Sequence, residues 1–164
     1  MAVENKYVDA SIVAGKKAVS AATGSGAEIV AFAVTFEVAA ADDDGSVYRI
    51  VKGIPSSLIP YQITVCNDAI TGGTSYDIGI YKTDSGAVIN KNVLMTAQTL
   101  ASALTRATGH QLGLGNVNVD SVGKSLAVLS AQTNPDEAYD LAVTANTVGS
   151  GAGTVTVIAE FLSV

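Results

Sequence analysis

The stretch "VAFAVTFEVAAADDDGSVYRIVK" (residues 30–52) holds two runs of alternating apolar residues on either side of an acidic turn. In the first run the large apolar residues occupy every second position from Phe32 to Val38, so an extended chain carries them on one face. Residues 46–52 repeat the alternation around Tyr48. The pattern predicts two β-strands, joined either as a hairpin or by a connection that crosses between two sheets.

Further strands follow at intervals along the chain. The alternation recurs in residues 61–67, 76–82, 138–146 and 154–162. Segments rich in Pro, Gly, Ser and Asp separate them, as expected of turns. At least six strands predict a mainly β protein whose economical architecture is an antiparallel β-sandwich, with jelly-roll order as one option.

Two segments between these strands favour helix instead. Residues 92–109 place Leu100 and Leu104 four apart among alanines, and residues 120–132 space their apolar residues similarly. We therefore expect one or two short helices in the 92–131 region.

The length and composition indicate one domain. A chain of 164 residues with 48% apolar residues can bury a substantial core. Residues 1–27 lack sustained periodicity and are rich in Ala, Gly, Ser and Lys. We expect them to form an N-terminal arm or peripheral strand, and residues 28–164 to form a single β-sandwich domain.

The charge distribution argues against nucleic acid and membrane as partners. The formal net charge is −6, and the nine Lys and Arg residues cluster no more densely than Lys16 and Lys17. Direct binding of nucleic acid needs a basic footprint that this chain lacks. No apolar run approaches the roughly 18 residues that span a membrane, and no signal pattern opens the chain. The lone Cys66 excludes an internal disulfide and is expected to be a small buried residue.

The three aspartates of the acidic turn do not match a calcium-binding loop. When Gly45 is aligned with the glycine of an EF-hand loop, Asp42 and Asp44 fall on ligand positions, but Ala40 and Val51 occupy two others. Aspartates in a turn between strands need no metal, because they cap their own backbone. We expect no metal, with Asp42 and Asp44 as the only candidate ligands.

No catalytic motif is complete in the sequence. Residues 123–125 match the end of a phosphate-binding loop, but Asn118 replaces the required glycine. The glycine-rich segments 24–29 and 113–118 lack the third glycine of a dinucleotide fingerprint. The sole histidine, His110, has no nucleophile at a telling spacing.

Carboxylate pairs carry no more weight than these motifs. Asp77, Glu37 and Glu160 could supply a pair for glycoside hydrolysis, but any β protein with fifteen acidic residues offers such pairs. The chain also lacks tryptophan, the usual platform for sugars. We therefore expect no enzyme and no cofactor.

Three segments resemble one family of structural proteins. They are "FEVAAADDDGSVYRI" (36–50), "VCNDAITGGTSYDIGIYKTDSGAVI" (65–89) and "LAVTANTVGSGAGTVTVIAEF" (141–161), and the opening "MAVENKYVDASIVAGKK" is similar in character. They resemble the small proteins encoded beside the major capsid gene of tailed bacteriophages, the head decoration or cement proteins. The resemblance rests on the amino-acid sequences of these segments and on their order along the chain. It provides no catalytic motif to carry over residue by residue.

The resemblance implies a β-sandwich or jelly-roll protein without a cofactor that docks on the outer face of the capsid. It would bridge neighbouring major capsid subunits as a homodimer or homotrimer, after synthesis in the cytoplasm of the bacterial host. The Thr-rich strands 154–161 and 142–146 would offer uncharged contact surfaces, and the N-terminal arm would reach onto an acidic neighbouring subunit. The residues expected to contact partners are Lys6, Tyr7, Lys16, Lys17, Asp42, Asp43 and Asp44.

An alternative reading is a β-sandwich binding module of a phage tail or host-recognition protein that binds carbohydrate. Such a module would share the low charge and the strands. It should also show exposed aromatic clusters or a fibrous repeat, and the sequence displays neither.

Overall fold

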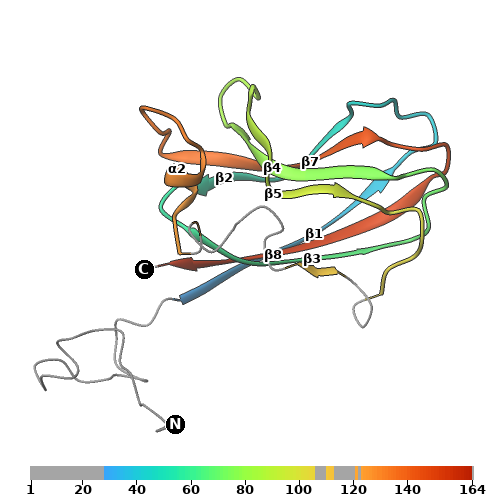
Figure 1. Ribbon diagram of the computed structural model, residues 1–164, viewed down its shortest axis with the longest axis horizontal. Helices are drawn as coiled ribbons and strands as arrows, with labels where there is room; N and C mark the ends of the chain where they lie inside the picture. Colours follow the sequence, from blue (N-terminus) through green and yellow to red (C-terminus); the bar gives the residue numbers. More distant parts are fainter. Residues whose placement is uncertain (1–27, 106–109, 113–120, 122, 164) are drawn as a thin grey trace, which may run out of the picture.

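The chain folds into two antiparallel sheets packed face to face, as the computed structural model shows (Figure 1). The structure describes residues 28–105, 110–112, 121 and 123–163. The expected arm, residues 1–27, lies outside the described residues. The prediction of a mainly β sandwich is confirmed.

Each sheet has four strands. Sheet A has the order β1-β8-β3-β6, with β1 (Glu28–Val38), β8 (Gly153–Ser163), β3 (Ile59–Asn67) and β6 (His110–Leu112). Sheet B has the order β2-β7-β4-β5, with β2 (Val47–Pro55), β7 (Ala138–Thr147), β4 (Ser75–Lys82) and β5 (Val88–Gln98). Because β1 and β2 belong to different sheets, the acidic turn between them crosses the sandwich and does not close a hairpin.

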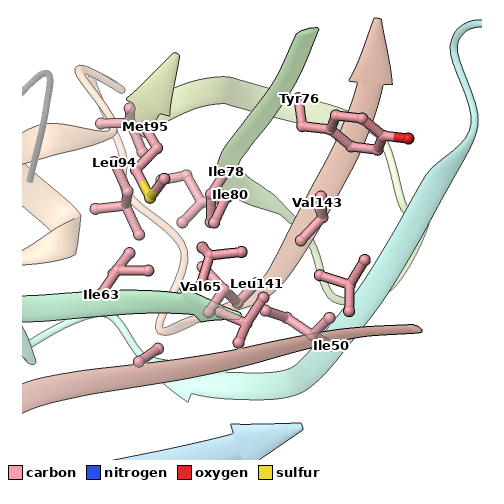
Figure 2. Packing of buried hydrophobic residues seen from close by; sticks show 14 of the residues in the cluster. Ile50, Ile63, Val65, Tyr76, Ile78, Ile80, Leu94, Met95, Leu141 and Val143 are labelled. Carbon is pink, nitrogen blue, oxygen red and sulfur yellow. The ribbon is translucent and has the colours of Figure 1, made fainter. Parts of the chain in front are cut away.

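The core lies between the inner faces of the two sheets. In β8 the inward residues Val155, Val157 and Phe161 are 0–1% exposed, and the alternation that predicted this strand places them there. Figure 2 shows Ile63 and Val65 of sheet A converging with side chains of sheet B. Each such side chain stabilises the fold by about 1.5–3 kcal/mol through removal from water.

The helical predictions are partly wrong. Residues 92–98, the first part of the segment 92–109 predicted as helix, belong to β5. The described helix is α2 (Leu126–Leu129), inside the second predicted segment, where Leu126 is fully buried. With four residues, α2 is the only helix among the described residues. No helix in this part of the chain is long and apolar enough to cross a membrane.

Residues 92–98 form a strand because three consecutive apolar side chains are buried in the core, whereas a helix would bury residues three or four positions apart. Val93, Leu94 and Met95 are all buried in succession, at a point where β5 slips in register against β4 between Ile78 and Ile80. A β-bulge of this kind removes the alternation by which a strand is recognised. Leu104 forms an isolated bridge with Asn67 of β3 and so does not continue a helical turn.

Candidate functional site

The acidic turn (residues 39–46) is held together by its own carboxylates. The carboxylate of Asp42 accepts hydrogen bonds from the Ala39 N–H at 2.9 Å and from the Tyr48 hydroxyl at 2.7 Å. These two bonds, the one from Tyr48 first, lower the pKa of Asp42 below its ordinary value. Burial, followed by the Asp42 hydrogen bond, raises the pKa of Tyr48. Asp42 therefore stabilises the turn as a carboxylate.

Asp44 links the acidic turn to the connection between β7 and β8. Its carboxylate accepts a hydrogen bond from the Val148 N–H at 2.8 Å, and the carbonyl of Val148 accepts one from the Tyr76 hydroxyl at 2.7 Å. Burial, followed by the charges of Asp42 and Asp44, raises the pKa of Tyr76 to about 12. Two chain connections at one end of the sandwich are thereby fixed to each other.

The remaining predicted site residues are distributed unevenly. Asp43 is exposed, and its backbone carbonyl accepts a hydrogen bond from the Ser46 hydroxyl at 2.6 Å. No group of three or more His, Cys, Asp or Glu residues that could hold a metal occurs among the described residues. Asp42 and Asp44, the two candidate metal ligands, bind the protein's own N–H and hydroxyl groups instead. The arm residues Lys6, Tyr7, Lys16 and Lys17 lie outside the described part of the chain.

The carboxylates considered for hydrolysis do not form one site. Asp77 lies on β4 in sheet B and is 3% exposed, whereas Glu37 and Glu160 lie on β1 and β8 in sheet A. Asp77 accepts a hydrogen bond from the Ala97 N–H at 2.8 Å. Glu37 accepts one from the Thr154 hydroxyl at 2.9 Å. The two sheets separate Asp77 from the glutamates.

A polar cluster around the buried Asp140 lies on the outer face of sheet B, and no pattern in the sequence predicted it. Asp140, on β7, is 1% exposed and lies 3.2 Å from the Arg49 guanidinium of β2. It also accepts a hydrogen bond from the Gly53 N–H at 3.0 Å. Arg49 packs against Gly86, where any side chain would collide with the guanidinium. The cluster joins β2, β7 and the turn between β4 and β5.

The same polar layer continues along β4 and β7. The Lys91 ammonium donates to the Asn146 side chain at 2.7 Å and lies 3.8 Å from the Asp77 carboxylate. Tyr81 hydrogen-bonds Thr144, which is 5% exposed. The expectation that residues 142–146 offer a contact surface is therefore wrong for Thr144, because β5 and its turn already cover this face.

The outer face of sheet A remains uncovered by the described residues. We call it the open face, and it is formed by outward residues of β1 and β8 centred on Ala31, Ala33, Thr35, Thr156 and Ile158. The Thr35 and Thr156 hydroxyls hydrogen-bond each other at 2.9 Å across the strands. No Lys or Arg occurs in β1, β3 or β8. The open face therefore carries small Ala and Thr side chains, no basic residue, and the two outward carboxylates Glu37 and Glu160.

A groove borders the open face at the end of β3. Its volume is about 380 Å³, and Cys66, Asn67, Thr154 and Thr156 are among the residues that line it. Cys66 is half-buried there, which differs from the full burial expected of it.

Known proteins resemble this chain in fold. No protein-family model matches the chain, and no curated protein matches it. A chain of the cyanophage Pam1 capsid asymmetric unit aligns over 99% of this chain and 99% of its own length, at 16% identity and a TM-score of 0.52. A chain of the capsid of Ralstonia phage GP4 aligns over 85% of this chain and 86% of its own length, at 13% identity and a TM-score of 0.54. The likeness establishes a shared fold.

Proposed function

We propose that this chain is a structural protein of a tailed-phage capsid, a decoration or cement protein that binds the outer capsid surface. The observation that carries the proposal is the fold likeness to chains of two phage capsids, one of them aligned over nearly the whole of both chains. It agrees with the resemblance that the sequence segments bear to head decoration proteins. The order β1-β8-β3-β6 facing β2-β7-β4-β5 supports a jelly roll.

The distribution of polar groups supports attachment through the open face. On the outer side of sheet B, Asp140 is paired with Arg49 and the backbone of Asn90 and Lys91 lies against Gly79, so the central strands β4 and β7 offer a partner little free surface. The open face offers Thr and Ala side chains that lose little conformational entropy on contact. A clamp repeated over many equivalent capsid sites converts modest affinity per copy into high avidity.

The partners in this role are the major capsid protein and further copies of this chain. The chain would clamp neighbouring capsid subunits, with the arm residues Lys6, Tyr7, Lys16 and Lys17 on an adjacent acidic subunit and the acidic turn at a subunit seam. Within the turn, Asp43 is best suited to an outside partner, because Asp42 and Asp44 already accept hydrogen bonds from this chain. The role requires no enzymatic activity and no cofactor.

Binding to capsids tests the proposal. The protein is mixed with empty capsids assembled from the major capsid protein of the same genome, and occupancy is measured by co-sedimentation and cryo-electron microscopy. We expect regular density at symmetry positions. Capsids without additional density from this protein, together with its binding to a glycan array, would instead support the host-recognition module.

Two lysine substitutions identify the docking face. Ile158→Lys places a charge on the open face, and Val128→Lys places the same charge on α2, where Val128 is 57% exposed. We expect Ile158→Lys to reduce occupancy and Val128→Lys to leave it unchanged. Equal occupancy for both variants would show that another surface docks. In the same assay, unchanged occupancy after deletion of residues 2–20 would exclude the role of the arm.

A further inference from the structure

The four edge strands of the sandwich differ in how they resist pairing with another strand. An unpaired strand edge is a template for association, and proteins block it with charge, proline, irregular pairing or short length. β2 carries Arg49, Lys52 and Pro55 and has two register shifts against β7. β5 has three register shifts against β4, and β6 has three residues. Three of the four edges are therefore blocked.

β1 has none of these features. Its eleven residues pair with β8 without a register shift, and between Glu28 and Glu37 it contains no charged residue, proline or glycine. Among the described residues no strand pairs with its second edge. A long, regular and uncharged edge is the kind that joins another strand.

The inward side chains of β1 are also incompletely covered. Phe32, Val34 and Phe36 are only half-buried, whereas their neighbours Val155 and Val157 on β8 are 0–1% exposed. Phe36 stacks on Tyr48 with ring centroids 4.9 Å apart, so the apolar row reaches the seam between the two sheets. A strand added beside β1 would bury this row further.

We propose that a second copy of this chain occupies the free edge, with β1 pairing antiparallel to its counterpart across a two-fold axis. Antiparallel pairing of identical strands about a residue places inward side chains opposite inward side chains, and from Val30 to Phe36 the inward row of β1 is apolar. Centred on Ala33, the pairing sets Phe32 opposite Val34 and Ala31 opposite Thr35, and it joins the two A sheets into one. Glu28 and Glu37 then face Val38 and Ile29, so no two acids are directly opposed.

The chain's own N-terminal segment fits the edge less well. Residues 12–21 end close to Glu28 in the sequence and could reach β1 only as a hairpin through the glycine-containing residues 22–27. Because Lys16 and Lys17 are adjacent, one of them falls on the inward row beside Phe32 or Val34 in either parity of register. An ammonium group there would lose solvation without a partner, whereas beside Phe32 and Val34 the second copy brings only apolar side chains.

This inference builds on the self-association included in the proposed function and selects the dimer over the trimer. It concerns the free protein, so its test uses no capsids and its failure leaves capsid binding to be judged separately. Sedimentation velocity of the full chain over a range of concentrations should give a species of twice the 16.5 kDa chain mass. A monomer at all concentrations, or a trimer, would overturn the proposal.

Two matched double variants test the pairing itself. Ala31→Lys/Thr35→Lys sets like charges opposite each other twice across the two-fold axis, and Ala31→Lys/Thr35→Glu sets opposite charges there. Both carry Ala31→Lys beside Glu160 of β8, and both alter exposed positions, so circular dichroism and urea unfolding should show similar folding. We expect the like-charge variant to dissociate at least about tenfold more readily than the opposite-charge variant. Equal dissociation of the two would overturn the β1 interface.

Deletion of residues 2–20 tests whether the chain's own N-terminal segment, and not a second copy, pairs with the edge of β1. If the chain's own segment covered the edge, the intact protein would be monomeric and the deletion would produce a dimer, which would refute the proposal. We expect the deletion variant to remain a dimer, as the intact chain is.

Discussion

The aspartates of this protein act mainly as acceptors for backbone N–H groups. Asp42, Asp44, Asp77 and Asp140 each accept from a backbone N–H, and three of the four donors lie more than ten residues away along the chain. A carboxylate used in this way fixes a connection that has no ladder partner of its own. The residues that look most reactive in the sequence therefore have a structural role in the fold.

The Arg49–Asp140 pair should show this role in stability. Asp140 is 1% exposed, so Arg49→Met leaves a buried carboxylate with only the Gly53 N–H as partner. Because the Arg49 side chain is 43% exposed and partly screened, we expect a loss of about 1–3 kcal/mol in the free energy of unfolding. Urea denaturation measures it.

The double variant supplies the control for this pair. Arg49→Met/Asp140→Asn removes the unpaired charge while keeping an oxygen for the Gly53 N–H. It should therefore be more stable than Arg49→Met alone. Strictly additive losses would show that the two residues do not interact.

The Asp42–Tyr48 hydrogen bond should make the stability of the fold fall at acidic pH. A carboxyl whose folded pKa is lowered contributes stability above its unfolded pKa, about 3.9, and loses that contribution as the pH falls through the folded value. Tyr48→Phe removes the hydrogen bond and its contribution. The difference in melting temperature between the wild type and Tyr48→Phe should then shrink as the pH falls from about 5 towards 3.

Tyr61→Phe is the matched control, because Tyr61 is 51% exposed. Its melting temperature should follow that of the wild type across the same pH range. A constant gap between wild type and Tyr48→Phe would argue that the hydroxyl acts through packing alone.

At the scale of the elements, the sequence predicts strands with regular alternation and misses those with bulges. β1 and β8 were predictable because every second residue is apolar and their ladder has no register shift. β5 was not, since the bulge at Val93–Met95 puts three consecutive residues in the core. The acidic turn was correctly read as a connection, but alternation alone does not say whether adjacent strands share a sheet.

The polar cluster on sheet B was unpredictable for a different reason. Arg49 and Asp140 are 91 positions apart, and they meet only because β2 and β7 are neighbours. A single sequence does not reveal strand order, so no local pattern could join these residues. The same holds for the free edge of β1, whose regularity was visible but whose position at the edge was not.

A pair of glycine substitutions tests whether residues 90 and 91 of β5 lie against Gly79 of β4. At Gly79 an added Cβ would collide with the backbone of Asn90 and Lys91, which cannot move aside as a side chain does. We expect Gly79→Ala to cost about 2–3 kcal/mol through overpacking. Gly45→Ala meets no atom within 4 Å, and its φ of +93° adds only the strain of a left-handed backbone, about 1 kcal/mol.

Urea unfolding of the two variants measures the difference. A smaller loss for Gly79→Ala than for Gly45→Ala would mean that residues 90 and 91 do not lie against β4. The Lys91 contacts with Asp77 and Asn146 would then need revision.

For the whole molecule, the two outer faces of the sandwich are unequal. In sheet B the outward residues Asp77, Asp140 and Thr144 of the central strands are buried, whereas sheet A presents the open face and, among the described residues, an unpaired edge at β1. The surface proposed for docking and the edge proposed for pairing therefore lie on one sheet. If β1 pairs with a second copy, the two open faces become continuous and form one surface without basic residues.

The shared core makes one further prediction for the whole molecule, that the two sheets unfold together. β7 and β8 are the central strands of sheets B and A, each is paired on both sides, and their inward residues belong to one apolar cluster. Removing either sheet would expose the inner face of the other, so partial opening gains no stable intermediate. Native-state hydrogen exchange followed by mass spectrometry should give peptides covering 139–146 and 154–161 the same free energy of opening. Peptides from the turn at Asp84 and Ser85 should exchange much faster. A lower free energy for either strand would show that its sheet opens alone.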